Sequence, residues 1–189
     1  MPILNILPFV HQMLGNHLKN GDTALDGTAG NGCDTVFLAD AVGEKGKVWA
    51  FDIQHQAIEQ TKVRLESENL LNRVQLVHDG HQHINHYIRQ GLDAAVFNFG
   101  WLPGGDKSIT TSSESSLDAL NAVLALLNPG GIAVAVLYPG HDAGRVEARA
   151  IESWAEGLPQ QEFAVLKYCF VNRQNHPPYV LAIEKLRRK

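Results

Sequence analysis

Two apolar segments of the chain each end in an aspartate, about one strand–helix–strand unit apart. The first ends at Asp26 and leads into the glycine-rich stretch 27–32, and the second ends at Asp52. In a parallel sheet the carboxyl ends of such strands meet at one edge, and glycines there let the backbone approach a ligand closely. An acid at the end of the second strand can accept hydrogen bonds from ribose hydroxyls. The pattern therefore predicts a nucleotide-type cofactor at the edge of a parallel sheet.

The spacing of the glycines narrows the choice of cofactor. A dinucleotide-binding turn has the spacing G-x-G-x-x-G, so that a helix N-terminus can hold a pyrophosphate. Here the glycines stand at positions 27, 30 and 32, with carboxylates at Asp26 and Asp34. These carboxylates would repel a pyrophosphate but tolerate the cationic amino-acid end of S-adenosylmethionine. We expect S-adenosylmethionine as the cofactor, and a dinucleotide-dependent dehydrogenase is the disfavoured alternative.

The hydrophobic pattern predicts a leading helix, five strand–helix repeats and a closing hairpin. Helices are expected at residues 3–19, 34–42, 56–70, 83–90, 113–127 and 142–157, and strands at 22–26, 47–52, 74–77, 94–99, 132–138, 163–171 and 179–184. The turn residues 128–131 should end the helix before the fifth strand. Because no helix separates the last two strands, they should pair antiparallel.

This order predicts a single α/β domain over residues 1–189. Five repeats followed by an antiparallel edge are the layout of the Rossmann-like class I methyltransferase fold. We therefore expect a seven-stranded, mostly parallel sheet with an antiparallel last strand, helices on both faces and an extra N-terminal helix.

The net charge and the spacing of the cysteines give no support to several classes of partner and site. The formal net charge of −4 gives no general attraction to nucleic acid or to an anionic membrane. The two cysteines, Cys33 and Cys169, match no metal or redox spacing, and no stretch is long and apolar enough to span a membrane. We expect no signal peptide, free thiols and a cytoplasmic location.

Polar residues gather where the predicted strands end, as ligand-binding residues do in open α/β sheets. Asp52 is the candidate for the ribose hydroxyls, although it could instead cap the next helix. Asp79 could accept the adenine amine or serve as a turn residue before Gly80. Asn31 and Asp34 could hold the amino-acid end of the cofactor or cap a helix. The full set of candidate cofactor-binding residues is Asp26, Thr28, Gly30, Asn31, Asp34, Thr35, Asp52, Gln54, Asp79, Gly80, His81, Asn98 and Gly100.

The segment from Asn98 to Lys107 follows the fourth strand and carries a second signal. Methyltransferases that act on amino nitrogens place an Asn/Asp-Pro-Pro-aromatic motif at this point. There the amide oxygen and a backbone carbonyl accept the two N–H bonds of an amine, which aims the nitrogen lone pair at the methyl group. Asn98 would be that acceptor and Trp101 a platform for a planar base. Alternatively, Trp101 is a core residue and Pro103 opens a plain turn.

Several histidines are candidates for other chemistry. His78, His81, His83 and His86 lie close together in sequence, but we expect no metal site, because a His-rich solvated helix is commoner than a complete ligand set. His141 follows the fifth strand together with Tyr138, and could orient a substrate or take a proton. A serine-hydrolase site is excluded because the chain lacks G-x-S-x-G.

With these residues in place, the chain resembles a bacterial family of tRNA 5-(aminomethyl)uridine methyltransferases, formerly described as rRNA methylases. The resemblance covers nearly the whole chain. The segments that carry it are 26–35, 51–54, 98–107, 138–141 with Gly144 and Glu147, and Asn175 with 177–179. This chain has Cys33 where the family usually has His, and Phe99 and Trp101 where the family has Leu and Tyr.

The resemblance implies methylation of the amino group of 5-aminomethyl-(2-thio)uridine in the anticodon loop of tRNA. A protonated amine has no lone pair, so the site must either bind the amine in its neutral form or remove a proton. The candidates to accept that proton are Asn98, Asp106, Tyr138 and His141. Candidate substrate-binding residues are Trp101, Pro103, Lys107, Arg145 and Arg173. Alternatives are methylation of rRNA, methylation of a small amine metabolite, or a catalytically inactive cofactor-binding module. The leading helix and the closing hairpin each offer a face for a homodimer.

Overall fold

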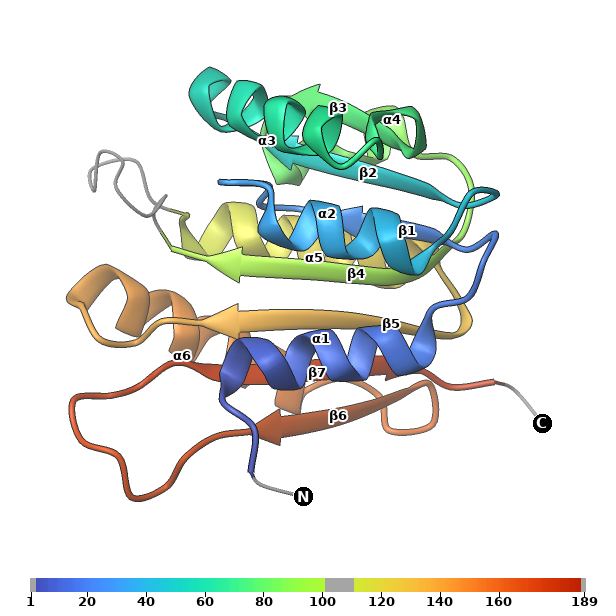
Figure 1. Cartoon of the computed structure of the whole chain (residues 1–189). Helices are drawn as coiled ribbons and strands as arrows, with labels where there is room; N and C mark the ends of the chain where they lie inside the picture. The colour runs from blue at the N-terminus through green and yellow to red at the C-terminus, as the bar shows by residue number, and fades with distance from the viewer. Residues whose placement is uncertain (1–2, 101–110, 188–189) are drawn as a thin grey trace.

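The computed structural model describes residues 3–100 and 111–187 of the chain. Its helices and strands form three layers, with one central sheet between two layers of helices (Figure 1). In chain order the elements are α1 (Ile6–His17), β1 (Thr23–Asp26), α2 (Cys33–Ala41), β2 (Lys47–Asp52), α3 (His55–Ser67), the 3-10 turn Leu71–Arg73, β3 (Val74–His78), the 3-10 turn His81–His83, α4 (Ile84–Tyr87), β4 (Leu92–Phe99), α5 (Ser113–Leu126), β5 (Leu127–Leu137), α6 (Asp142–Glu156), β6 (Phe163–Tyr168) and β7 (Tyr179–Lys185).

The sheet has seven strands in the order β3-β2-β1-β4-β5-β7-β6. Strands β1 to β5 pair in parallel, whereas β7 is antiparallel to both of its neighbours, β5 and β6. The strand order reverses at β1 and β4, which is the switch point where open α/β sheets bind ligands. The predicted Rossmann-like methyltransferase fold is confirmed, including the antiparallel last strand and the N-terminal helix.

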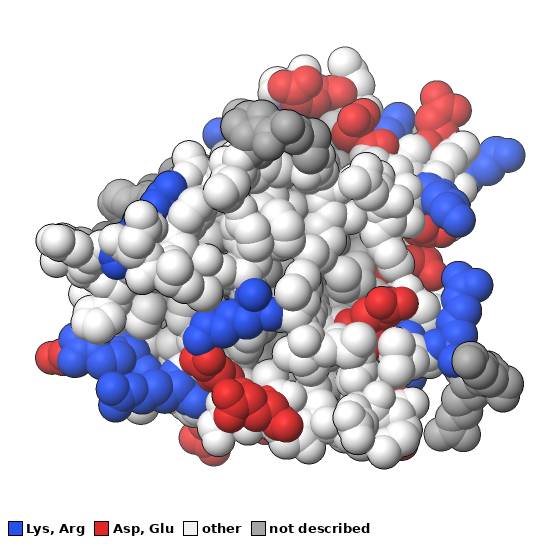
Figure 2. Space-filling view, turned by 90° about the horizontal axis from the view of Figure 1, so that it is seen from below, with Lys and Arg blue, Asp and Glu red and all other residues white. Residues whose placement is uncertain are grey.

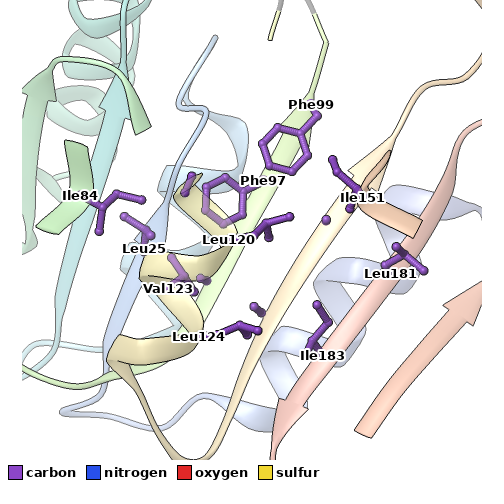
Figure 3. Packing of buried hydrophobic residues seen from close by; sticks show 14 of the residues in the cluster. Leu25, Ile84, Phe97, Phe99, Leu120, Val123, Leu124, Ile151, Leu181 and Ile183 are labelled. Carbon is purple, nitrogen blue, oxygen red and sulfur yellow. The ribbon is translucent and has the colours of Figure 1, made fainter. Parts of the chain in front are cut away.

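Alternating side chains of the central strands fill two separate cores. On one face, Phe97 and Phe99 of β4 pack with Leu120 of α5, and Figure 3 shows these residues together with Ile84 of α4 and Ile151 of α6. The two Phe rings are fully buried and stacked, with centroids 5.0 Å apart. Each fully buried side chain of this size contributes roughly 1.5–3 kcal/mol relative to leaving it exposed.

The opposite face of the sheet is covered by α1, α2 and α3. Val96 of β4 points to this side and shares a core with Leu14 of α1 and Leu38 of α2. Pro8 lies in the first turn of α1, where its missing N–H costs no intrahelical hydrogen bond. This packing holds α1 against α2 and the neighbouring strands, and so brings an N-terminal helix close to the carboxyl ends of β1 and β4.

Most predicted ends lie within three residues of the observed ones; β6, for example, ends at Tyr168 rather than at 171. Two elements differ in a more important way. The helix expected at 83–90 is only the four-residue α4 that follows a 3-10 turn. Strand β5 begins at Leu127 rather than at 132, because residues 128–131 form a bulge inside it. In that bulge the register shifts between the pairs Leu92–Leu127 and Ala94–Ile132, and Gly130 has a φ of 87°.

Within residues 3–100 and 111–187, no helix has the length and apolar character that crossing a bilayer requires.

Candidate functional site

A cavity of about 660 Å³ opens at the carboxyl ends of β1, β2, β4 and β5, beside the N-terminal part of α1. In Figure 1 this is the left-hand edge of the sheet, toward which the parallel strands point. The residues that line the cavity are Leu7, His11, Gly27, Thr28, Ala29, Gly30, Asn31, Cys33, Asp34, Asp52, Ile53, Gln54, His81, Gln82, Asn98, Gly100, Thr111, Ser112, Ser115, Tyr138 and His141.

The glycine-rich loop between β1 and α2 lines the cavity, and its glycines stand where a side chain would be strained or would clash. A methyl group on Gly27 would overlap the ring of Phe97, which packs directly beneath the loop. Gly30 and Gly32 have φ angles of 51° and 79°, in the left-handed region that glycine adopts without strain. At these glycines the loop offers its backbone to whatever occupies the cavity.

The loop is fixed to the ends of both neighbouring strands. The Asp52 carboxylate at the end of β2 accepts hydrogen bonds from Gly30 N and Gln54 N, each at 2.9 Å. On the other side, Thr28 Oγ1 accepts a hydrogen bond from Asn98 N at the end of β4, at 2.7 Å. Gln54, rather than Asp52, is the N-cap residue of α3.

Asp26 and Thr35 lie beneath the loop, fully buried, and neither lines the cavity. The Asp26 carboxylate accepts hydrogen bonds from Thr35 Oγ1 at 2.6 Å and from Thr28 N at 3.0 Å. Burial, with a smaller contribution from the nearby charge of Asp34, raises the pKa of Asp26 to about 7. These two predicted cofactor residues therefore hold the loop from below.

Asn98 stands at the cavity wall with its amide held from both ends. Its Nδ2 donates a hydrogen bond to Asp34 Oδ2, and its Oδ1 accepts one from the Tyr138 hydroxyl at 3.2 Å. Burial and the Asp34 charge raise the pKa of Tyr138, which favours the protonated phenol that donates this bond. Sequence reasoning named all three residues, and the fold brings them together from β4, α2 and the end of β5.

His11 of α1 extends this polar chain, and sequence reasoning missed it. Its Nε2 lies 2.6 Å from Asp34 Oδ1, and its ring stacks on Phe37 with centroids 4.2 Å apart. The contact joins residues 23 positions apart on two different helices. A lone histidine in an amphipathic helix gives no sequence signal for such a contact.

The adenine amine acceptor predicted at Asp79 is instead engaged with its own chain. The Asp79 carboxylate bonds with His83 Nδ1 at 2.8 Å and accepts from the Tyr87 hydroxyl at 2.9 Å. The His83 contact is the main reason that the pKa of Asp79 is lowered. Neither Asp79 nor Gly80 lines the cavity.

His81 lies inside the cavity wall where Asp79 does not. Its Nδ1 is 3.2 Å from Gly27 O, and burial lowers its pKa to about 4, so the ring is neutral near pH 7. Within the described part of the chain, its buried Nε2 has no hydrogen-bond partner. A neutral ring that donates from Nδ1 leaves a lone pair at Nε2 for a ligand donor.

The remaining predicted site residues fall into three groups. His141 lines the cavity and caps α6, since its Nδ1 accepts from Gly144 N at 3.1 Å. Arg145 on α6 pairs with Asp142, and Arg173 in the β6–β7 loop donates to Asn5 Oδ1, so both lie outside the cavity lining. The predictions at Trp101, Pro103, Asp106 and Lys107 lie outside the described residues.

The histidines near Asp79 have separate contacts. His78 Nε2 is 3.0 Å from Ile53 O, whereas His83 pairs with Asp79 and stacks on His86. In residues 3–100 and 111–187, no group of three or more His, Cys, Asp or Glu side chains is placed to hold a metal ion.

Besides His11, several lining residues were not named as candidates. They are Leu7, Ala29, Cys33, Ile53, Gln82, Thr111, Ser112 and Ser115. Ala29, Cys33 and Ile53 lie in the predicted loops after β1 and β2, whereas tertiary packing brings the others to the cavity.

Comparison with known proteins gives one family model over most of the chain. The family described as "Putative rRNA methylase" matches residues 48–184, and a protein-L-isoaspartate O-methyltransferase model matches residues 5–88. A putative rRNA methylase structure from Clostridium thermocellum is 42% identical, with a TM-score of 0.97, over 98% of this chain and 100% of that one. A putative methyltransferase from Streptococcus mutans in complex with SAH is 37% identical, with a TM-score of 0.90 over 98% and 100% of the two chains.

A curated relative is also similar over most of the chain. The chloroplastic tRNA (mnm(5)s(2)U34)-methyltransferase of Arabidopsis thaliana is 35% identical over 178 residues, which are 89% of this chain. The chain spans 65% of the length of that relative.

Proposed function

Since the chain belongs to the putative rRNA methylase family, we propose that it is an S-adenosylmethionine-dependent N-methyltransferase of tRNA. Its substrate is the amino group of 5-aminomethyl-(2-thio)uridine at the wobble position, and its product is the methylaminomethyl form. The similarity to the Arabidopsis tRNA methyltransferase supports this substrate, and the Streptococcus relative in complex with SAH supports the cofactor.

The residues around the cavity fit S-adenosylmethionine. Asp52 uses two backbone N–H bonds, and a carboxylate has about four lone-pair positions, so two remain for ribose hydroxyls. The buried Nε2 of His81 is suited to accept a hydrogen bond from the exocyclic amine of adenine. When bound, the cofactor supplies an electrophilic methyl group.

The observation that carries the proposal of amine methylation is the fixed amide of Asn98. The side chain is held between Asp34 and Tyr138 at the cavity wall, so its oxygen is directed before substrate arrives. A preoriented acceptor can hold one N–H bond of a neutral amine and leave the nitrogen lone pair aimed along one direction, which is positioning catalysis. Accepting from both Tyr138 and an amine uses the two lone pairs of one carbonyl oxygen.

RNA binding by an acidic chain needs local basic surface. Figure 2 shows Lys and Arg in separate groups on the face seen from the β6 side, with both uncharged surface and acidic side chains between them. Arg173 lies 3.6 Å over the Phe170 ring and is tied to Asn5 just before α1, whose Leu7 lines the cavity. An exposed guanidinium stacked on an aromatic ring suits a phosphate or an unstacked base.

The direct test supplies the protein with methyl-labelled S-adenosylmethionine and tRNA that carries unmethylated 5-aminomethyl-2-thiouridine. Nucleosides from the digested RNA are separated and identified by mass spectrometry. We expect label in 5-methylaminomethyl-2-thiouridine, and none in tRNA that lacks the aminomethyl group.

Parallel incubations with ribosomal RNA and with free amine metabolites test the alternative substrates. Label that appears only in one of those would replace the tRNA proposal. Analytical ultracentrifugation of the same preparation measures its mass in solution, and so tests whether the chain forms a homodimer.

A further inference from the structure

We propose that Asp34 and His11 form a proton-accepting pair that removes the proton from the substrate ammonium and passes it to solvent. The inference rests on the proposed amine methylation and deepens it. It assigns Asp34 as the group that meets the substrate, and His11 as a positioning residue that acts through Asp34.

The geometry of the pair suits this role. Nε2 of His11 and Oδ1 of Asp34 are 2.6 Å apart, and both side chains line the cavity. Stacking on Phe37, with 4° between the ring planes, holds the imidazole edge toward the carboxylate. The Asp34 side chain is 14% exposed and that of His11 is 34% exposed, so the pair leads from the cavity toward water.

Other candidates among the described residues are less suited to accept the proton. Tyr138 donates its hydroxyl proton to Asn98 Oδ1, and its raised pKa keeps the phenol protonated. The Nδ1 lone pair of His141 accepts the Gly144 N–H that caps α6. The oxygen of Asn98 is an amide oxygen, which is a weak base. Asp34 therefore offers the basic lone pairs nearest to the Asn98 amide.

The substrate ammonium loses one proton, its N–H electron pair stays on nitrogen, and the neutral amine is left with the lone pair that methylation needs. The Asp34–His11 pair gains that proton, so the carboxylate and the imidazole together hold two protons instead of the one that they shared before. Histidine is the side chain that exchanges protons with water most readily near pH 7, so His11 returns the pair to its starting state.

Several other titratable side chains surround the pair, so their charges also affect its pH dependence. In the described part of the chain, Cys33 on α2, Asp52 at the end of β2, His81 after β3, and Tyr138 and His141 after β5 line the same cavity, and Asp26 is buried beneath its loop.

The test is the pH profile of kcat for His11→Gln, measured with the aminomethyl tRNA substrate at saturating S-adenosylmethionine. Glutamine can still donate a hydrogen bond to Asp34 but cannot exchange a proton. Loss of general-base assistance should lower kcat about 100-fold near pH 7. The deficit should shrink toward alkaline pH, where water already supplies the neutral amine. Added imidazole should restore part of the rate near pH 7.

The control is His17→Gln on the same helix, whose Nε2 contacts Asp93 O away from the cavity. It should keep the wild-type pH profile, and both variants should keep the wild-type affinity for S-adenosylhomocysteine. An active wild type with unchanged kcat in His11→Gln would overturn the proton-accepting pair and leave the proposed function standing. A deficit that is equal at every pH would also overturn it, because His11 would then act only in structure. An inactive wild type would instead overturn the proposed function.

Discussion

The Asp52 carboxylate accepts a hydrogen bond from Gly30 N at 2.9 Å, and so joins the end of β2 to the glycine-rich loop after β1. The two residues that the sequence pattern marks for cofactor binding thus also hold each other in place. One side chain fixes the backbone that approaches the cofactor and presents its remaining lone pairs to the cavity.

Replacing Asp52 by Ala should weaken S-adenosylhomocysteine binding about 10-fold to 100-fold, since hydrogen bonds to a charged group contribute roughly 1.5–3 kcal/mol each. Isothermal titration calorimetry with the cofactor product measures this directly. The matched control is Glu59→Ala on the solvent side of α3, which should bind as the wild type does. Equal affinities for Asp52→Ala and the control would remove Asp52 from the cofactor site.

The contact between Gly27 and Phe97 predicts a steric effect on stability. A methyl group at position 27 would overlap the buried Phe97 ring, so Gly27→Ala should lower the free energy of unfolding by about 1–3 kcal/mol. Urea denaturation checks the value. The double variant with Phe97→Leu should recover part of the loss, because the smaller side chain leaves space for the methyl group. Strict additivity of the two substitutions would argue against the contact as the cause.

Much of the fold was predictable because its signals are local. The strand ends at Asp26 and Asp52 mark a buried apolar run followed by an acid, and the structure has both at the predicted positions. The start of β5 was missed because residues 128–131 read as a helix stop. In the fold they form a bulge after which β5 pairs along β4.

The site was predictable only where a residue lies at the carboxyl end of a strand or in the loop and first helical turn that follow it. Asn98 and Asp34 were named on that basis, whereas His11 reaches the same place through the packing of α1 on the sheet. Asp79 shows the converse problem. Its hydrogen bonds with His83 and Tyr87, four and eight residues later, turn the carboxylate to its own chain, and the same helical spacing could have signalled this competition.

The raised pKa of Asp26 predicts a pH-dependent contribution to stability. The pKa rises from 3.8 to about 7 on folding, so between these values the folded chain binds more protons than the unfolded chain. The contribution is therefore present at acidic pH and is lost as pH rises through about 7. Asp26→Asn cannot ionise, and relative to wild type it should become progressively more stable from about pH 4 to about pH 7.

Urea denaturation of both proteins without cofactor, at matched pH values, gives this difference. The neutral, buried His81 contributes with the opposite sign but is present in both proteins, so it cancels in the comparison. A pH-independent difference would mean that Asp26 ionises alike in the folded and unfolded chains.

The two-sided hold on Asn98 predicts graded losses of turnover. Asn98→Ala removes the acceptor for the amine, and kcat should fall at least about 100-fold while S-adenosylhomocysteine still binds. Tyr138→Phe removes only the hydroxyl that orients the amide, and should cost about 10-fold. Mass spectrometry of the product nucleoside supplies the rates. Asn121→Ala on α5, which removes an exposed bond to Trp154, is the control. Wild-type turnover in Asn98→Ala would contradict the role given to this residue.

The stack of Arg173 on Phe170 predicts how the chain holds RNA. If Arg173 contacts a phosphate, Arg173→Ala should weaken tRNA binding and reduce the slope of log affinity against log salt by about 1. Phe170→Ala keeps the charge but removes the ring that supports it, so affinity should fall with little change in the salt slope. Fluorescence anisotropy with a labelled anticodon stem-loop over a range of salt concentrations separates the two effects. Arg64→Ala, on the exposed surface of α3, controls for the simple loss of one positive charge. If Arg64→Ala and Arg173→Ala shift the affinity and the slope equally, the β6–β7 loop has no specific part in RNA binding.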